Sequence, residues 1–461
     1  MHTFLIEFDE NKPKYIQLYE YIINNIKSGI IKENEKLPSK RMLSIDLKIS
    51  QNTIENTYEL LKSEGYIESK ERSGYYVLKY IDSSSKIKVL HTPVENIIKR
   101  PKYNLTTSSI DFKSFPIIMW SRLTKEALKS NYYSLGSFQG DYNLRYEISK
   151  YLAEYRGINA NPDNIVLGSG IEYLIPQLTK ILESPFGIEN PGYKKVSYIL
   201  SNNKIKYQLI DLDYNLNNKI KTIYVTPSHQ FPTGISMTIR KKHELIKWAI
   251  NNSSFIIEDD YDSEYRFDGA TNTSLYSINN EKVIYLSTFS RTISPSLRIA
   301  YMILPDKIIT KYKELYQSYA NPISRLDQQV LAMFIKNGCY IRHLRKTKTL
   351  YKKKRDLIIS ILKKNKIKFN ISNIGLSLLI NLDKIVDEDK MINNLLKYDI
   401  KINFISSYYY TKCLKSKIVI GFAQIDINDI NFVMDKLIKE IKDIEWCPLI
   451  LFRFFYRFNL L

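Results

Sequence analysis

A short apolar run that leads into small residues and then into a helix most constrains the fold of this chain. The run Ile165-Val166-Leu167 predicts a buried strand, Gly168-Ser169-Gly170 predicts a tight turn, and residues Ile171 to Leu182 predict a helix. A helix N-terminus behind such a turn presents backbone N–H groups and the positive end of the helix dipole to an anion such as a phosphate. The pattern indicates α/β structure, although a Gly-Ser-Gly turn alone is weak evidence for a binding site.

A second predicted strand, Phe255-Ile256-Ile257, ends in the acidic residues Glu258-Asp259-Asp260. Adjacent acids at a strand end are usually solvated charge, so they indicate a site only in combination with other segments. Two such segments run from Tyr224 to Gly234 and from Ser287 to Tyr301. A chain is less expected to contain all four segments in this order by chance than to contain any one of them.

Length and composition favour two or three domains with large buried cores, because the chain has 461 residues of which 44% are hydrophobic. Cys339, Cys413 and Cys447 are too widely spaced for a disulfide framework or a zinc cluster. The sequence shows no charged-then-apolar leader and no apolar run of about 20 residues, which a membrane helix would need. We therefore expect a cytoplasmic protein with no membrane partner and no bound metal.

The net charge of +20 does not by itself indicate a nucleic-acid partner. Residues 1–80 contain 12 basic and 12 acidic residues, so the whole excess lies in the remaining 381 residues. A general lysine bias explains such an excess as well as DNA binding does. A DNA partner must therefore be argued from the pattern of residues rather than from charge.

Three helices and a hairpin are predicted within residues 1–80. Apolar residues at helical spacing mark a first helix that ends at Gly29: Tyr15, Leu18, Tyr19, Ile22 and Ile26. The second helix has Ser39 as its expected N-cap, with Met42, Leu43 and Leu47 on its core face. The third helix has Ser50 as its expected N-cap, with Ile54, Tyr58 and Leu61 facing inward.

The short break between the second and third helices is typical of a helix-turn-helix. Four polar residues face outward at the start of the third helix: Gln51, Asn52, Glu55 and Asn56. After Gly65, the segment from Tyr66 to Tyr80 predicts two strands around the turn Glu71-Arg72-Ser73-Gly74. This hairpin would form a wing.

The strings Leu37-Pro38-Ser39-Lys40-Arg41, Ile49 to Ile54 and Glu64-Gly65-Tyr66-Ile67 closely resemble the winged helix of GntR-type regulators. The resemblance implies a double-stranded DNA operator as partner. It implies that Ser39 and Arg41 contact backbone phosphates and that Arg72 and Gly74 reach the minor groove. Residues at the start of the third helix would enter the major groove: Gln51, Asn52, Thr53 and Asn56.

Two of these residues depart from the family pattern. Relatives often have arginine where this chain has Gln51 and Asn56, so two cationic contacts are missing. Gln and Asn can read adenine edges with two hydrogen bonds, so we expect a changed base preference rather than loss of binding. For any single polar residue of this set, a solvated helix face is the alternative interpretation.

Residues 81–102 contain Ser83-Ser84-Ser85, scattered lysines and two prolines, and we expect them to form a linker. From Tyr103 onward, segments in a fixed order resemble the aminotransferase-like body of MocR/GabR-type regulators, in which a GntR-like winged helix is fused to a fold-type-I domain. The segments outside those already described are Ile110 to Pro116, Gly136 to Gly140, Leu326 to Gln329 and Tyr351 to Asp356.

The expected architecture is a winged helix-turn-helix followed by a large α/β domain of the PLP-dependent-transferase (fold type I) class with a smaller C-terminal α/β subdomain, where PLP is pyridoxal phosphate. The expected bounds are 1–80 for the winged helix, 103–445 for the body, about 340–445 for the small subdomain, and 446–461 for an atypical apolar tail. We expect the basic run from Arg342 to Arg355 to be a solvated helix face rather than a DNA contact.

The resemblance also implies a PLP site. Asp259 would pair with the pyridine nitrogen and keep it protonated, and Tyr261 would hydrogen-bond the ring oxygen. The cofactor phosphate would lie against the Ser169-Gly170 turn and Arg298, whose planar guanidinium suits a phosphate. Thr288 and Ser290 would add hydroxyl groups.

One residue of this expected site is anomalous. Arg291 stands where the family has the lysine that forms the Schiff base with the cofactor aldehyde, and no lysine occurs between Lys282 and Lys307. A guanidinium stays protonated and has no lone pair with which to attack an aldehyde. Covalent attachment is therefore not expected, and three states of the site stay open: PLP held non-covalently, another anionic ligand, or no ligand.

The sequence favours a regulator: a homodimer whose winged helices bind an operator while the body senses a small anionic or amino-acid-like effector. Two alternatives stay open. A PLP-dependent aminotransferase would need the missing lysine. A degenerate body that serves only for dimerisation would need no ligand.

Overall fold

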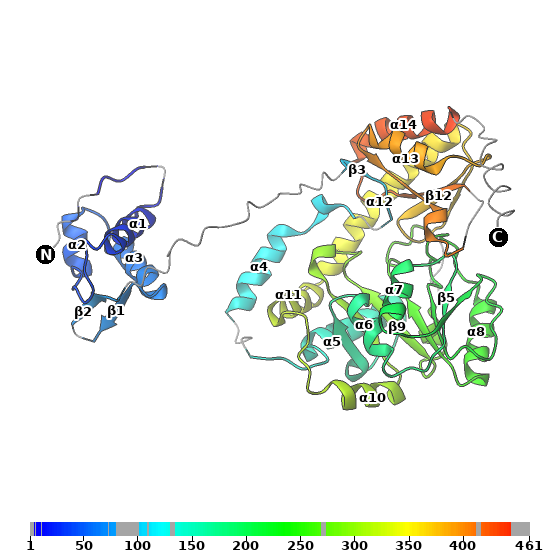
Figure 1. Cartoon of the computed structure of the whole chain (residues 1–461), viewed down its shortest axis with the longest axis horizontal. Helices are drawn as coiled ribbons and strands as arrows, with labels where there is room; N and C mark the ends of the chain where they lie inside the picture. The colour runs from blue at the N-terminus through cyan, green and yellow to red at the C-terminus, as the bar shows by residue number, and fades with distance from the viewer. Residues whose placement is uncertain are drawn as a thin grey trace, which may run out of the picture. The chain divides into compact units, whose positions relative to one another are not determined.

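The structure is a computed structural model, and it describes residues 4, 6–10, 12–71, 73–79, 101–107, 110–129, 134–268, 273–411 and 416–443. The chain divides into two compact units, Met1–Ile98 and Lys99–Leu461 (Figure 1). Arg72, residues 81–100 of the expected linker and the expected tail at 446–461 lie outside the described residues. Among the described residues, no helix is long and apolar enough to span a membrane.

The N-terminal unit is a winged helix, as predicted. Its elements are α1 (Lys14–Lys27), α2 (Lys40–Asp46), α3 (Gln51–Ser63), β1 (Ile67–Lys70) and β2 (Gly74–Val77). The two strands pair in antiparallel register, with Ile67 opposite Val77 and Lys70 opposite Gly74. The hairpin therefore places Glu71 and Ser73 at its tip.

Both predicted N-caps are present in this unit. The Ser39 Oγ accepts a hydrogen bond from the Met42 N–H and the Ser50 Oγ accepts one from the Thr53 N–H, each at 3.2 Å. The predicted core is largely confirmed by fully buried side chains: Leu18, Ile22, Leu43, Ile54, Tyr58 and Leu61. The prediction for Met42 is wrong, because this short helix turns Leu43 inward and leaves Met42 39% exposed.

The large sheet of the second unit has the order β4-β10-β9-β8-β7-β5-β6 in the described ranges. Its strands are β4 (Ile165–Gly168), β5 (Phe186–Glu189), β6 (Tyr207–Ile210), β7 (Thr222–Val225), β8 (Phe255–Asp259), β9 (Val283–Thr288) and β10 (Ala300–Ile303). β10 runs antiparallel to both of its neighbours, and the other pairs are parallel. The parallel strands end at a common edge.

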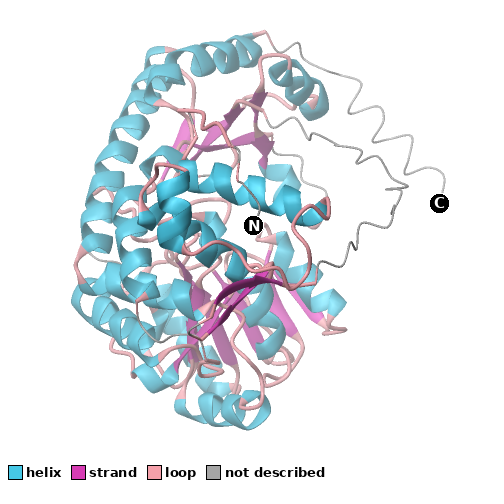
Figure 2. Ribbon diagram, turned by 90° about the vertical axis from the view of Figure 1, so that its left-hand side faces the viewer, coloured by secondary structure: helices cyan, strands magenta, loops and turns pink. Residues whose placement is uncertain are grey.

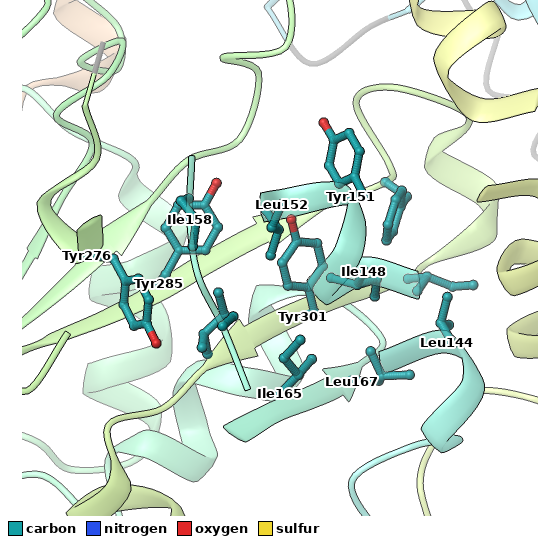
Figure 3. Packing of buried hydrophobic residues seen from close by; sticks show 14 of the residues in the cluster. Leu144, Ile148, Tyr151, Leu152, Ile158, Ile165, Leu167, Tyr276, Tyr285 and Tyr301 are labelled. Carbon is teal, nitrogen blue, oxygen red and sulfur yellow. The ribbon is translucent and has the colours of Figure 1, made fainter. Parts of the chain in front are cut away.

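Helices flank this sheet (Figures 1 and 2). They are α4 (Ile117–Leu128), α5 (Tyr142–Arg156), α6 (Ile171–Leu178), α7 (Lys194–Asn202), α8 (Ile239–Asn251), α9 (Leu275–Ile278), α10 (Asp306–Tyr316) and α11 (Arg325–Lys336). In Figure 3, Tyr285 and Tyr301 from the sheet pack with Ile148 and Tyr151 of α5. This packing buries one face of the strands that carry the expected site.

The helix predicted from Ile171 to Leu182 is shorter than expected and ends at Leu178. Beyond Leu178 the chain continues in tighter turns with hydrogen bonds of the 3₁₀ type. The Lys180 and Ile181 N–H groups donate to carbonyls three residues earlier, those of Gln177 and Leu178. The start of the helix at Ile171, which matters for the anion site, is as predicted.

The small subdomain begins with the long helix α12 (Cys339–Lys364), which leads from α11 toward the smaller sheet (Figure 1). That sheet is antiparallel, in the order β11-β12-β15-β14, and comprises β11 (Phe369–Ile371), β12 (Ser377–Asn381), β14 (Asn403–Phe404) and β15 (Lys417–Gly421). It packs with α13 (Glu388–Leu396) and α14 (Ile430–Lys442). The opening strand of the body, β3 (Tyr103–Asn104), pairs with β13 (Ile400–Lys401), so the start of the body joins its last part.

Part of the basic run in α12 is not a solvated face, contrary to prediction. Lys354 is 1% exposed and Arg355 is also buried. The Lys354 Nζ donates to the Asp111 Oδ2 at 2.8 Å and to the Ala423 carbonyl at 2.7 Å. Burial lowers the pKa of Lys354, and the Asp111 carboxylate opposes this effect. The residue ties the opening segment of the body to α12 and to the segment after β15.

We predict that Asp111→Asn destabilises the body by about 2–4 kcal/mol, because it leaves a buried ammonium without its carboxylate. Asn retains the side-chain oxygen that caps the Lys113 N–H. The matched control is Asp383→Asn, whose partner Lys368 forms an exposed pair at 2.9 Å and should cost less than about 1 kcal/mol. Thermal unfolding of the full chain measures both, and equal effects would contradict the structural role of Lys354.

Candidate functional site

Strand register brings the expected site residues to one edge of the large sheet. Ala300 of β10 lies opposite both Gly168 of β4 and Thr288 of β9. On the other side of β9, Asp259 at the end of β8 lies opposite Leu286. Four segments of the chain therefore meet at the carboxyl edge of the sheet, which is where α/β sheets bind ligands. They are the ends of β4, β8 and β9 and the beginning of β10.

The turn before α6 forms a cradle for an anion. Gly170 has φ +118°, and a Cβ at this position would lie 2.4 Å from the Arg298 Nη2. Only glycine therefore lets this guanidinium approach the N-terminus of α6, whose dipole favours negative charge. Arg298 itself adopts a left-handed conformation with φ +50°, which turns its side chain toward α6.

A carboxylate that the sequence analysis did not single out lies in this cradle. The Glu172 Oε2 accepts from the Arg298 Nη2 at 2.8 Å, and the Glu172 Oε1 accepts from the Lys195 Nζ at 2.9 Å. Burial acts to raise the pKa of Glu172, but the hydrogen bonds from Lys195 and Arg298 lower it to about 2. Glu172 is therefore ionised at neutral pH.

The two hydroxyl residues of the expected site differ in their hydrogen bonding. The Thr288 Oγ1 donates to the Ile299 carbonyl at 3.2 Å and accepts from the Ser290 N–H at 3.0 Å, so it braces the loop. The Ser290 Oγ is buried and has no hydrogen-bond partner among the described residues. A buried polar atom of this kind is a candidate ligand contact.

Asp259 is buried at the end of β8, where the Tyr224 hydroxyl donates to its Oδ2. Burial raises the pKa of Asp259 to about 7, and the nearby Asp260 and Asp262 act in the same direction. A cationic N–H donor would stabilise the ionised form of this carboxylate. The environment therefore suits a protonated ring nitrogen.

Tyr261 lies beside His229, a contact that the sequence did not predict. The Tyr261 hydroxyl donates to the His229 carbonyl at 2.8 Å and lies 3.1 Å from the His229 Nδ1, which is 3.1 Å from the Asp262 Oδ1. The phenol oxygen keeps a lone pair with which to accept a further hydrogen bond. Its expected contact with a ring oxygen stays a prediction.

Arg291 is held in the site by three groups. Its Nη1 donates to the Thr107 carbonyl, its Nη2 lies 3.7 Å from the Asp262 Oδ2, and its guanidinium carbon lies 6.0 Å from the centre of the Tyr261 ring. The side chain is 14% exposed. Arg291 is thus a fixed, largely buried cation in the loop after β9.

Tyr193, at the N-terminus of α7, is a further site residue that the sequence analysis missed. Its ring packs edge-on against Phe231 at 5.5 Å, and burial raises its pKa, with Glu172 and Asp259 adding to the effect. The ring therefore lies within the field of both the anion cradle and Asp259. Its position after Asn190-Pro191-Gly192, a turn signal that follows β5, is the one clue in the sequence.

The expected DNA-contacting residues are exposed on the winged helix. Gln51, Asn52 and Asn56 are solvent-exposed along α3, and Arg41 is exposed on α2. Thr53 is half-buried and its hydroxyl lies 2.8 Å from the Ser50 Oγ, so it is partly engaged in the cap.

Two further residues complete this surface. The Ser39 hydroxyl is an N-cap acceptor that can still donate, and Gly74 has φ +116° next to the tip of the wing. A missed contact, Lys40 to Glu55 at 2.7 Å, joins α2 to α3.

Comparison with known proteins agrees with both halves of this structure. Residues 14–77 match the family described as bacterial regulatory proteins of the gntR family, and residues 100–437 match the aminotransferase class I and II family. The chain is 35% identical to the uncharacterized HTH-type transcriptional regulator YdeL of Bacillus subtilis (strain 168), over 92% of this chain and 96% of that protein. The chain belongs to the HTH-type transcriptional regulators that carry an aminotransferase-like domain.

The regulator is also similar to a second regulatory protein and to a solved aminotransferase structure. It is 26% identical to the probable rhizopine catabolism regulatory protein MocR of Rhizobium meliloti, over 92% of each chain. Its body superimposes on the kynurenine aminotransferase of Pyrococcus horikoshii with a TM-score of 0.67 and 22% identity, covering 78% of the regulator and 96% of that chain. The second likeness shows the fold alone. The match of residues 100–437 to the aminotransferase class I and II family is what implies PLP, by family resemblance.

We predict that the regulator becomes less stable as pH rises from 5.5 to 8. Asp259 ionises near pH 7 in the fold but near 3.8 otherwise, so between these values the fold keeps a proton that the unfolded chain has released. At about 1.4 kcal/mol per pH unit, the ionised carboxylate costs about 4 kcal/mol in total, of which the range from pH 5.5 to 7 contributes about 2 kcal/mol.

As the pH rises over this range, the melting temperature of the Asp259→Asn variant should therefore fall by less than that of the unmodified chain. A residual loss is expected, because burial also raises the pKa values of Glu258 and Glu264 to about 7. The control Asp211→Asn changes an exposed carboxylate. The explanation is wrong if the Asp259 variant and the control lose the same number of degrees.

Proposed function

We propose that this chain is a DNA-binding transcriptional regulator whose aminotransferase-like body binds PLP, or a related phosphate-bearing ligand, without covalent attachment and without transamination. The observation that carries the proposal is that Arg291 is a fixed cation, in the segment where the family resemblance would place the Schiff-base lysine. The rest of the binding edge is retained around it. The proposal assigns DNA binding to residues 1–80 and ligand sensing to residues 103–445.

The donor groups of the site support a phosphate-bearing pyridine ring. The turn at Ser169 and Gly170, the Arg298 guanidinium and the buried Ser290 hydroxyl would hold the phosphate. Thr288 would support this loop rather than contact the ligand directly. When bound, PLP supplies an electron-withdrawing ring, which a protonated nitrogen makes more effective.

Two acidic or phenolic groups would orient the ring. Asp259 would accept from the ring nitrogen, because burial makes its ionised form costly without a cationic partner. Tyr261 would hydrogen-bond the ring oxygen: its hydroxyl proton is donated to the His229 carbonyl, and a lone pair of its oxygen is left to accept. Asp259 and Tyr261 would thus set the ring's orientation, while the amine needed for catalysis is missing.

Arg291 would hold two parts of the site together through its charge. It joins the opening segment at Thr107 to the Asp262 carboxylate, and it keeps a positive charge beside the site. A ligand would therefore enter and leave without bond formation, and a small anionic or amino-acid-like effector would change its occupancy. Such an effector regulates DNA binding only if it binds the competent and incompetent states with different affinities.

The winged helix would bind operator DNA in the cytoplasm, as part of a homodimer that recognises two half-sites. Ser39 and Arg41 would contact phosphates, whereas residues at the start of α3 would read the major groove: Gln51, Asn52, Thr53 and Asn56. Gly74 would let the wing approach the minor groove together with Arg72. These roles follow from the family pattern and from the exposure of the described residues.

Substitution of Arg291 by lysine should create a covalent PLP linkage where the unmodified chain has none. A lysine amine desolvated at this position can attack the aldehyde, whereas the guanidinium cannot. We would add PLP, record the visible absorbance, reduce with borohydride and locate the modified peptide by mass spectrometry. The expected result is a reduced adduct at residue 291 in the variant only.

The matched control is Arg240→Lys, because Arg240 is 89% exposed on α8 and pairs there with Glu244 rather than with a residue of the site. A borohydride-stable linkage in the unmodified chain would overturn the interpretation of Arg291. Absence of the adduct in Arg291→Lys would show that the rest of the pocket does not hold PLP in a reactive position.

Operator binding should depend on α3 and fall with salt, because phosphate contacts release counterions. Asn52→Ala should cost about 1–3 kcal/mol and relax base preference, whereas Arg41→Ala should weaken all sequences and reduce the salt slope by about one. Fluorescence anisotropy on DNA from beside the gene measures both. The control is Lys62→Ala, which removes a charge at the far end of α3. If Lys62→Ala weakens binding as much as Asn52→Ala does, the predicted groove contact is refuted.

A further inference from the structure

Both cations at the N-terminus of α6 are engaged by one carboxylate. Glu172 accepts from Arg298 at 2.8 Å and from Lys195 at 2.9 Å, and its own backbone N–H also favours the charged form. Arg298 and Lys195 come from different parts of the chain, the loop before β10 and the first turn of α7. They converge on the single acidic residue in the first turn of α6.

The Glu172 carboxylate also lies directly over the glycine turn. A Cβ at Gly170 would lie 2.8 Å from the Glu172 Oε2 and 2.4 Å from the Arg298 Nη2. An incoming phosphate needs this same space, the same guanidinium and the same helix end. Glu172 thus has the chemistry and the position of an anion already bound in the cradle.

Charge balance gives the consequence. Arg298 and Lys195 carry two positive charges, of which Glu172 neutralises one. A phosphate monoester carries a charge of about −1.5 to −2 at neutral pH. While Glu172 stays in place, the positive charge that is left on the two cations is too small to balance the phosphate. Glu172 must therefore move aside for the phosphate to be fully compensated. Movement is feasible, because the three side chains are 37–57% exposed and exposed ion pairs are weak.

We propose that Glu172 is an internal anion that competes with the phosphate of the ligand for Arg298 and Lys195, and so sets how weakly and reversibly a phosphate monoester binds. The proposal rests on the proposed function in one respect, that the turn before α6 is the phosphate site. Without a lysine at 291 and with this competitor present, ligand occupancy follows the free concentration of the phosphate ester. Glu172 acts on affinity and is not a catalytic residue.

The test is the affinity of the full chain for inorganic phosphate and for PLP, measured by isothermal titration calorimetry at constant ionic strength. Glu172→Gln should bind both about three- to tenfold more tightly, because glutamine keeps the size of the side chain and removes its charge. Glu172→Ala should act in the same direction and serves as the second variant if the first does not fold. Arg298→Gln should weaken binding of both probes.

The matched control is Glu244→Gln. Glu244 also bridges two cations, Arg240 at 3.0 Å and Lys241 at 3.3 Å, but it does so on the exposed face of α8. Its removal changes net charge by the same amount and should leave both affinities unchanged. An equal gain in this control would show that the effect is general electrostatics and would overturn the proposal.

Other outcomes separate this proposal from the proposed function. Unchanged or weaker phosphate binding in Glu172→Gln, with PLP still bound by the unmodified chain, would mean that Glu172 organises the two cations, and only the competition would be wrong. Failure of all variants to bind either probe would overturn both the competition and the ligand-sensing part of the proposed function. DNA binding would stand in either case, because it is measured separately.

Discussion

The antiparallel position of β10 between β4 and β9 is the constraint on which the candidate site depends. It places Ala300 opposite Gly168 and Thr288, so the turn before α6 and the loop after β9 end side by side. The loop that leads into β10 then carries Arg298 to Glu172, 126 residues away in sequence. Because these strands are buried on both faces, a shift of register would move their side chains into the packing of the opposite face, and this misfit fixes the register.

Charge is distributed around this edge in a way that suits binding more than catalysis. Asp259 is a buried acid with a raised pKa, which a cationic ring nitrogen would stabilise, and Arg298 offers a guanidinium to a phosphate. Arg291 adds a permanent cation, held by Thr107 and Asp262. In the proposed function this cation stands where the family resemblance would place the nucleophilic lysine, so the ligand is held without a covalent bond.

The sequence predicted elements that depend on near neighbours and missed contacts between distant ones. The caps at Ser39 and Ser50 and the strands β4 and β8 are confirmed, because a cap needs only the next three residues and a buried strand needs only an apolar run. Met42 and Lys354 were misjudged, because periodicity does not show which face of a short or long helix meets another element. Tyr193, Lys195 and Glu172 were missed, because none lies in a distinctive string.

The sequence by itself determined the two-part architecture, the residues that end each strand, and the absence of a lysine at position 291. These properties are local, since turn chemistry, hydrophobic period and the identity of one residue can be read without the fold. The tertiary structure decided which polar groups meet: Glu172 with Arg298 and Lys195, Arg291 with Asp262, and Lys354 with Asp111. Such pairs depend on strand order and register, which bring together residues that no local pattern relates.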